Sequence, residues 1–171
     1  MAGEPRFAAA AALGLGFRPI TDADLPFLRE LYGSTRALEL APVPWTPEQK
    51  AAFIDMQFRA QHTQYMANYQ GAQFLVILRE DAAIGRLYLD RGAREHRIID
   101  IALMPEHCGK GLGTALLRDV LGEAAAAGRS VTIHVEKFNP AMRLYQRLGF
   151  EKIEDAGVYD LMRRAARPQS G

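Results

Sequence analysis

The stretch LMPEHCGKGLGTALL, residues 103–117, decides the architecture, because strand-type sequence changes to helix-type sequence within it. Residues 98–103, which lead into it, are rich in isoleucine and leucine and predict a strand. After Gly111 the apolar residues recur at helical spacing as far as Ala124, and Gly128 is placed to end that helix. A strand is therefore expected to pass through a glycine-rich turn directly into a helix.

The three glycines of this turn, Gly109, Gly111 and Gly113, indicate an anion-binding site. A helix begins with free backbone N–H groups at the positive end of its dipole, and glycine lets a phosphate approach them closely. Lys110 adds a positive charge nearby. The spacing differs from a P-loop, because no Gly-Lys-Ser/Thr follows, and from a dinucleotide-binding turn, which would follow the first strand. The residues alone also allow a tight turn without a ligand.

The remaining elements form a mixed pattern of strands and helices. Strands are predicted at residues 16–20, 74–78, 84–89, 98–103, 131–135, 152–155 and 159–162. Helices are predicted after Thr21, Thr46 and Asn139, which are all capping residues. Short polar turns join the three strands before the glycines and predict an antiparallel meander. The strands at 98–103 and 131–135, which a helix connects, should be parallel.

The composition sets limits on partners and cofactors. The chain has 171 residues, of which 49% are hydrophobic, and these suffice for a core without disulfides or metals. Lys and Arg total 21 against 20 for Asp and Glu, so no global field favours nucleic acid or a membrane. The single cysteine, Cys108, excludes an internal disulfide and suits a reducing compartment, so we expect a cytoplasmic protein. We expect residues 1–15 to be a disordered N-terminal tail, residues 16–165 a single domain, and residues 166–171 a C-terminal tail.

Two motifs carry a family resemblance. Residues 103–117 resemble the acetyl-CoA signature of the GNAT superfamily of N-acetyltransferases, and residues 139–150, NPAMRLYQRLGF, resemble its second signature. The resemblance implies an α/β (α+β) fold with a central mixed, mostly antiparallel sheet of six to seven strands. It also implies a parallel, splayed pair of strands at the centre and about four flanking helices. The activity implied is transfer of an acetyl group from the cosubstrate acetyl-CoA to an amine, without a metal.

The resemblance also implies where acetyl-CoA binds. The main-chain N–H groups of residues 109–114 are expected to bind the pyrophosphate, and the strand through residues 101–103 to pair with the pantetheine amides. The family commonly has Gln or Arg where this chain has Cys108, so a phosphate contact is lost; the alternative role for Cys108 is a reactive thiol of lowered pKa. The expected contacts are Ile101, Ala102, Leu103, Cys108, Gly109, Lys110, Gly111, Leu112, Gly113, Thr114, Asn139 and Tyr145.

Amine acetylation needs a proton acceptor for the amine and a proton donor for the departing thiolate. Tyr145 matches the family position whose phenol protonates the CoA sulfur, although a core aromatic residue would fit the same pattern. Glu95 resembles the position from which some members activate the amine, and Asp100, inside the strand, is the second candidate base. Either carboxylate is alternatively the ion-pair partner of a neighbouring arginine. His134 and Glu136 are further candidates for moving a proton.

The acceptor pocket is expected between the helices of residues 21–69. That region has no acidic run, which favours a small-molecule amine or a peptide N-terminus over a highly basic acceptor. Neither nucleic acid nor a membrane is expected as a partner, and the sequence leaves a homodimer open. The alternative function is a non-catalytic acyl-CoA-binding sensor or regulatory module, since a fold alone guarantees no chemistry. Tyr145 argues against that alternative.

Overall fold

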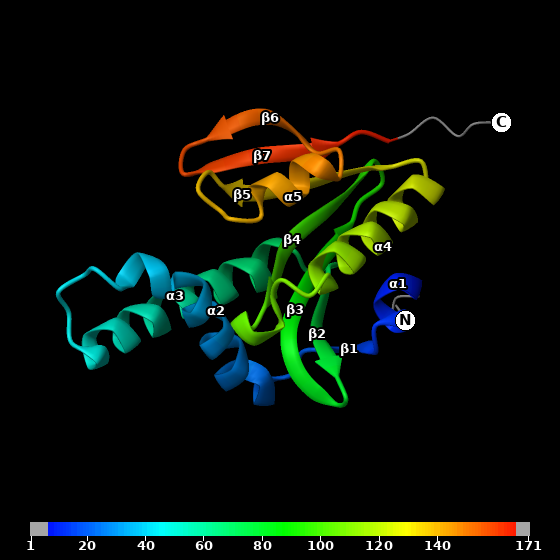
Figure 1. The fold of residues 1–171 in the computed structure, drawn as a ribbon. Helices are drawn as coiled ribbons and strands as arrows, with labels where there is room; N and C mark the ends of the chain where they lie inside the picture. The colour runs from blue at the N-terminus through cyan, green and yellow to red at the C-terminus, as the bar shows by residue number, and fades with distance from the viewer. Residues whose placement is uncertain (1–6, 167–171) are drawn as a thin grey trace.

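Seven strands form one mixed sheet in the computed structural model, which describes residues 7–166. Their order across the sheet is β1-β2-β3-β4-β5-β7-β6 (Figure 1). The neighbours β1 to β4 pair in antiparallel fashion, which confirms the predicted meander. The strands are β1 (Leu15–Pro19), β2 (Gln73–Arg79), β3 (Ala82–Arg91), β4 (Glu95–Leu103), β5 (Ser130–Glu136), β6 (Glu151–Ala156) and β7 (Tyr159–Arg164).

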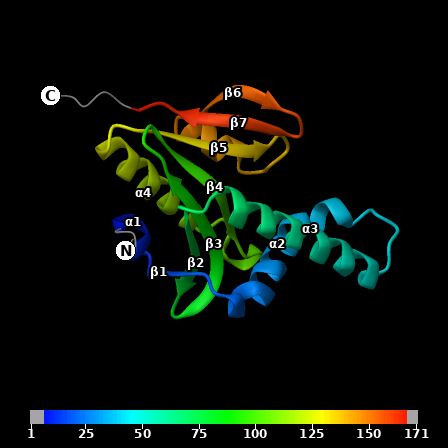
Figure 2. The same cartoon turned by 180° about the vertical axis from the view of Figure 1, so that it is seen from behind.

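Helices cover both faces of the sheet. On one face lie α1 (Ala8–Ala12), α4 (Leu112–Ala126) and α5 (Met142–Arg147). On the other lie α2 (Leu25–Leu40) and α3 (Pro47–Asn68), which are seen from behind in Figure 2. Within residues 7–166, no helix has both the length and the apolar character that a bilayer crossing requires.

The hydrophobic core is divided between the two faces. The larger cluster packs α1, α4 and α5 against the sheet, with Leu116, Val120 and Ile98 almost fully buried within it. The smaller cluster joins Leu28 and Tyr32 of α2 to Phe58 of α3. Phe58 is the one buried residue of α3, a helix of 22 residues that reaches the sheet through the ring of Tyr65, packed edge-on against Tyr88, and through hydrogen bonds to Asp100 and Arg86. The α2–α3 side is therefore the more loosely packed layer.

The predicted parallel pair, β4 and β5, separates partway along its length. Pairing runs from Glu95 opposite Ser130 to Ile98 opposite Ile133, and no further partners join these strands within the described chain. The register between β3 and β4 also shifts here, so that Ile99 has no partner on β3. We call the separated segments, residues 99–103 of β4 and 134–136 of β5, the splay. Its existence confirms the splayed pair that the motifs implied.

The bulge at Ile99 determines which side chains face which helices. Side chains normally alternate between the two faces of a strand, so Ile98 and Asp100 would share a face. The extra residue changes that phase. Ile98 and Ile101 both pack in the larger core, whereas Asp100 bonds to Arg86 and to Tyr65 of α3 on the opposite face. A polar group thus reaches the α3 side of the sheet beside the splay.

The expectation of a disordered tail over residues 1–15 is wrong for residues 7–15. These form α1 and the start of β1, and Phe7 and Ala10 are buried in the larger core. Phe7 packs edge-on against Phe17, with the ring centroids 5.4 Å apart. The alanine run has no amphipathic pattern that would predict a packed helix. Its small side chains nevertheless allow the helix to pack closely on α4. Residues 1–6 lie outside the described residues.

Asp119 of α4 fastens this N-terminal helix. Its carboxylate accepts hydrogen bonds from the amides of Ala9 and Ala10, at 3.0 and 2.8 Å. We expect Asp119→Ala to lower the free energy of unfolding by about 1–2 kcal/mol, because both amides lose their acceptor. Urea denaturation measures this loss. Asp119→Asn keeps one acceptor oxygen, so its free energy of unfolding should lie between those of the wild type and Asp119→Ala. Unchanged urea midpoints for both variants would contradict the role assigned to Asp119.

Candidate functional site

The glycine turn takes the backbone shape that its sequence predicts. Gly109 and Gly111 have φ angles of 74° and 79°, in the left-handed region that favours glycine. Gly111 is the N-cap of α4, and a Cβ atom at Gly113 would have no heavy atom within 4 Å. Two of the glycines are therefore required by the turn itself, whereas Gly113 leaves open space over the first turn of the helix.

The backbone amides of this turn have no acceptor among residues 7–166. The first amide of α4 with a main-chain partner belongs to Ala115, which donates to the Gly111 carbonyl at 3.1 Å. None of the amides of residues 109–114 donates to any group in the described part of the chain. Consecutive free N–H groups at the positive end of a helix form a site for an anion such as phosphate. Within residues 7–166, no group of three or more metal-ligating side chains was found.

Cys108 immediately precedes these amides. Its Sγ atom lies 3.7 and 3.6 Å from the carbonyl oxygens of Leu103 and Met104. Burial, with a smaller contribution from Glu106, raises the pKa of the thiol above its ordinary value. This direction is opposite to the lowered pKa that the alternative of a reactive thiol requires.

The expected pantetheine strand has one free edge. Ile101, Ala102 and Leu103 pair with β3 on one side, opposite Leu87, Arg86 and Gly85. Their other edge faces β5, to which they are not paired. An unpaired strand edge presents N–H and C=O groups that an extended ligand with amides can bond as a further strand would. The free edge leads toward the glycine turn, so both expected donor contacts are contiguous.

Tyr145 lies on α5 and is nearly enclosed. Its side chain is 5% exposed, and its ring packs edge-on against Phe150 at 5.6 Å. The hydroxyl bonds to no group among the described residues. Burial, and secondly the charge of Asp100, raise the pKa of the phenol well above its ordinary value. Tyr145 therefore keeps its proton at neutral pH and lies within electrostatic reach of the splay.

Asp100 is the carboxylate that the fold brings to the splay. Its Oδ2 atom accepts hydrogen bonds from Arg86 Nη2 at 2.7 Å and from the Tyr65 hydroxyl at 3.2 Å. Arg86 is 3% exposed, and Gln61 of α3 bonds the same nitrogen at 2.9 Å. The Oδ1 atom of Asp100 has no partner among residues 7–166. The ion pair expected as the alternative is present, yet it leaves one carboxylate oxygen available.

Glu95 is not brought to the same place. It lies opposite Ser130 at the first paired position of β4 and β5, three residues before the pairing ends at Ile98. At ~3.3 Å per residue, this puts it roughly 10 Å from Ile98, the last paired residue before the splay. Its side chain is 42% exposed, and its nearest cationic partner is Arg97 at 3.8 Å. Of the two candidate carboxylates, only Asp100 lies where the strands separate.

Three other predicted residues are engaged by neighbours. His134 Nδ1 lies 3.3 Å from Arg97 Nη1, and Glu136 forms an ion pair with Arg36 of α2 at 2.6 Å. Asn139 is not the N-cap of α5, which begins at Met142. Its Oδ1 atom instead accepts a hydrogen bond from the amide of Ala141 at 2.8 Å, and its carbonyl accepts one from the amide of Met142 at 3.0 Å, in the turn that precedes the helix. The predicted start of this helix is corrected accordingly.

Sequence reasoning named Arg86 only as one of three arginines that could pair with Glu95 or Asp100. The signal was present, because a single arginine interrupts the apolar run of residues 84–89. A charged side chain in a buried strand requires a partner, and here the partner is Asp100 on the neighbouring strand. The register of β4 opposite β3, with Arg86 paired with Ala102 and Tyr88 with Asp100, brings the two residues to the same face.

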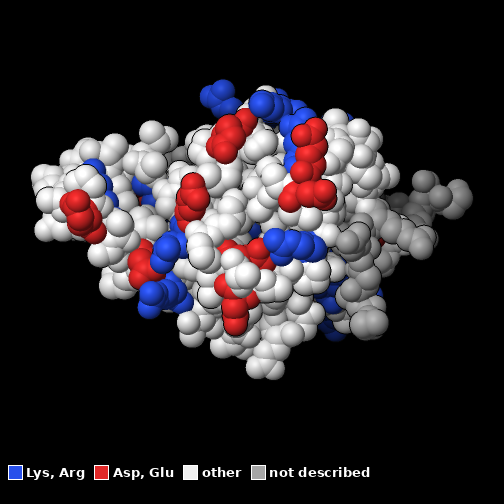
Figure 3. All heavy atoms as spheres, turned by 90° about the horizontal axis from the view of Figure 1, so that it is seen from below, with Lys and Arg blue, Asp and Glu red and all other residues white. Residues whose placement is uncertain are grey.

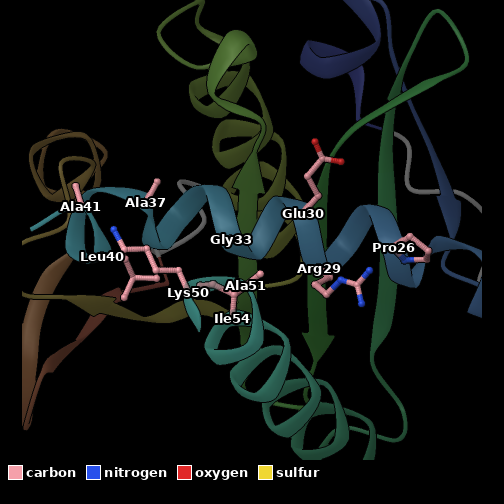
Figure 4. Close-up of a pocket in the computed structure, with 10 residues that line it drawn as sticks. All are labelled: Pro26, Arg29, Glu30, Gly33, Ala37, Leu40, Ala41, Lys50, Ala51 and Ile54. Carbon is pink, nitrogen blue, oxygen red and sulfur yellow. The ribbon is translucent and has the colours of Figure 1, made fainter. Parts of the chain in front are cut away.

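A groove of about 630 Å³, apart from the glycine turn and the splay, lies between α2 and α3 (Figure 4). Gly33 and Ala37 leave space along α2, and Ala51 and Ile54 line the α3 side. None of the predicted donor-binding or catalytic residues lines it. Seen from below, basic and acidic side chains are interspersed over the surface (Figure 3).

Comparisons with known proteins agree with this geometry. The family model described as acetyltransferase (GNAT) domain matches residues 15–151. A PaiA N-acetyltransferase from Thermoplasma acidophilum in complex with coenzyme A superposes with a TM-score of 0.66 at 19% identity, over 88% of this chain and 98% of the other. Arabidopsis thaliana Naa50, in complex with the bisubstrate analogue CoA-Ac-MVNAL, gives 0.57 at 17% identity, over 89% and 99%. A search of curated protein sequences finds no match.

Proposed function

The chain belongs to the acetyltransferase (GNAT) domain family, and on that basis we propose that it transfers the acetyl group of acetyl-CoA to a primary amine within a ternary complex. The observation that carries the proposal is the row of unpartnered amides at residues 109–114 beside the splay. The acceptor is a small-molecule amine or a peptide N-terminus. The Thermoplasma acidophilum structure contains coenzyme A, and the Arabidopsis thaliana structure contains the bisubstrate analogue CoA-Ac-MVNAL, so CoA and a peptide-bearing ligand both occur on this fold.

The donor follows the path of free main-chain groups. The pyrophosphate binds the amides of residues 109–114, and the pantetheine arm pairs with the free edge of residues 101–103. Asn139, in the loop after β5, is a further proposed contact of the donor. The thioester then lies at the splay, within reach of Tyr145 and Asp100. This placement uses backbone groups for most contacts, so it tolerates the cysteine at position 108.

The proposed chemistry is a direct attack. The neutral amine nitrogen forms a bond to the thioester carbonyl carbon, and the carbon–sulfur bond breaks. The free Oδ1 atom of Asp100 holds the amine and accepts its proton, directly or through water. The Tyr145 hydroxyl donates a proton to the departing CoA thiolate, so that charge balances on both sides. Asp100 replaces Glu95 as the first candidate, because only Asp100 lies at the splay.

Two measurements test the proposal. Acetyl-CoA at ~100 times its dissociation constant should stabilise the protein by roughly 2.7 kcal/mol, seen as a rise in melting temperature. Thiol release should then be followed across a library of amines. The absence of any thermal shift would overturn both the enzyme and the sensor alternative. A shift without turnover of any amine would favour the sensor.

Cys108→Arg should tighten acetyl-CoA binding. A guanidinium at this position restores a charged contact to the pyrophosphate, and we expect about tenfold higher affinity, since such a hydrogen bond contributes about 1.5–3 kcal/mol. Isothermal titration calorimetry measures the affinity. Cys108→Ser, which adds no charge, serves as the control and should bind as the wild type does. A looser complex for the arginine variant would contradict the placement of the pyrophosphate.

A further inference from the structure

The C-terminal half of α3 lies across β3 and β4, whereas its N-terminal half projects away from the sheet (Figure 2). Gln61 and Tyr65 extend from the half that crosses the sheet, and because they are one helical turn apart they lie on the same face of the helix. Both side chains reach the ion pair of Arg86 and Asp100. The attachment of α3 to the sheet thus involves the carboxylate that is proposed as the base.

The four side chains form one continuous chain of hydrogen bonds. Arg86 Nη2 donates to Asp100 Oδ2 at 2.7 Å and to Gln61 Oε1 at 2.9 Å, so both hydrogens of this nitrogen are used. The Tyr65 hydroxyl donates to the same oxygen of Asp100, at 3.2 Å. Gln61 therefore bonds the cation of the ion pair and Tyr65 bonds the anion, from adjacent turns of one helix.

Both donors to Asp100 converge on one of its two oxygens. The terminal torsion of an aspartate side chain is soft, so a carboxylate without partners can rotate. Here one donor comes from β3 and the other from α3, and two donors on separate elements restrict that rotation. No hydrogen bond joins Oδ1 to another group among residues 7–166. Oδ1 is therefore a free acceptor at a defined position.

Tyr65 is suited to act only as a donor in this arrangement. Burial, and secondly the charge of Asp100, raise the pKa of its phenol well above the ordinary value. The phenol thus keeps its proton at neutral pH, and Asp100 is the acceptor. The ring packs edge-on against the fully buried Tyr88, with the centroids 6.0 Å apart. This packing does not depend on the hydroxyl, so the hydroxyl can be removed without changing the contact of the ring.

From these contacts we propose that Tyr65 and Gln61 are positioning residues, which hold the Asp100 carboxylate so that its Oδ1 atom meets the acceptor amine. The proposal rests on the proposed function, in which Oδ1 accepts the amine proton. Neither positioning residue touches the reacting atoms. Tyr65 acts on Asp100 directly, and Gln61 acts through Arg86. Because the same hydrogen bonds attach α3 to the sheet, the positions of the base and of α3 are fixed together.

Tyr65→Phe is the main test, because it removes one donor and keeps the ring against Tyr88. We expect kcat with the preferred amine of the library to fall about tenfold, the effect of one hydrogen bond to a charged group. KM for acetyl-CoA should stay within about twofold, because no residue of α3 is among the proposed donor contacts. Gln61→Met removes the acceptor for Arg86 at similar length. It should lower kcat by about threefold, since Gln61 acts through a second residue.

Tyr69→Phe is the matched control. Tyr69 is the C-cap residue of α3, its ring packs edge-on against Tyr65 at 6.4 Å, and its hydroxyl bonds to no group among residues 7–166. This variant should keep the kcat of the wild type. Wild-type kcat for Tyr65→Phe, or an equal loss for Tyr69→Phe, would overturn the proposal.

A double-mutant cycle separates positioning from a purely structural role. Asp100→Asn removes the proposed base, so Tyr65→Phe should have no further effect on kcat in that background. Additive losses in the double variant would show that Tyr65 acts independently of Asp100 and would overturn the proposal. Wild-type kcat in Asp100→Asn alone would instead remove Asp100 as the base, and the positioning role would be overturned with it.

Amide hydrogen exchange of the free protein tests the attachment of α3 without an assay of activity. Tyr65→Phe and Gln61→Met should raise the exchange rates of residues 59–68 by about threefold to tenfold and leave those of α4 unchanged, because only α3 loses hydrogen bonds to the sheet. Tyr69→Phe should change neither helix. Unchanged exchange of residues 59–68 in both variants would overturn the proposal, whereas the absence of an acetyl-CoA thermal shift in the wild type would overturn the proposed function.

Discussion

Gly113→Asp is expected to abolish acetyl-CoA binding while leaving the fold intact. The residue lies in the first turn of α4, where an added Cβ atom meets open space. The helix dipole stabilises an acidic side chain at this end of the helix. The same carboxylate would occupy the space above the free amides and repel the pyrophosphate. Two like charges ~4 Å apart repel by about 4 kcal/mol at a protein surface, so affinity should fall by at least about a hundredfold.

Calorimetric titration with acetyl-CoA and thermal denaturation of the free protein measure the two effects separately. Gly122→Asp is the matched control, because Gly122 lies in the same helix, is exposed and also has no heavy atom within 4 Å of a Cβ. The control should bind acetyl-CoA normally. Retained affinity in Gly113→Asp, with the melting temperature unchanged, would show that the pyrophosphate binds elsewhere.

Tyr145→Phe is expected to lower kcat by about a hundredfold or more, the usual contribution of a general acid. Phenylalanine keeps the edge-on packing against Phe150, so the core should be preserved. The hydroxyl forms no bond with the described residues, and its removal therefore leaves no buried partner unsatisfied. Steady-state thiol release measures kcat, and titration with acetyl-CoA checks that the affinity remains within a few-fold of the wild type.

Tyr159→Phe provides the comparison, because Tyr159 lies opposite Glu136 at the start of β7 and is assigned no role in proton transfer. It should keep kcat. Wild-type turnover by Tyr145→Phe, with the fold intact, would remove the acid assignment and leave the tyrosine as a core residue.

Much of the fold follows from local sequence. Capping at Thr46, with Gln49 as its reciprocal partner, begins α3 as predicted, and the strands and glycine turn appear close to their predicted positions. These features depend on neighbours within a few residues, so the sequence states them directly. The proposed donor site is also a local feature, because its amides are consecutive in the chain.

The residues on the proposed acceptor side of the sheet could not be predicted from local sequence. The pairing of Arg86 with Asp100, and of Arg97 with His134, depends on how β3, β4 and β5 are aligned. A one-residue change of register moves a side chain to the other face of the sheet, and no local pattern records it. The order of Glu95 and Asp100 as candidate bases was reversed for this reason.

The sequence by itself determined the order of the elements, the glycine turn and the expected donor, because each rests on contacts between near neighbours in the chain. The tertiary structure alone decided that residues 7–15 fold onto α4, that Asp100 rather than Glu95 reaches the splay, and that Gln61 and Tyr65 of α3 bond to the ion pair beside it. Those outcomes require segments far apart in the chain to pack together, and burial and register act between such segments.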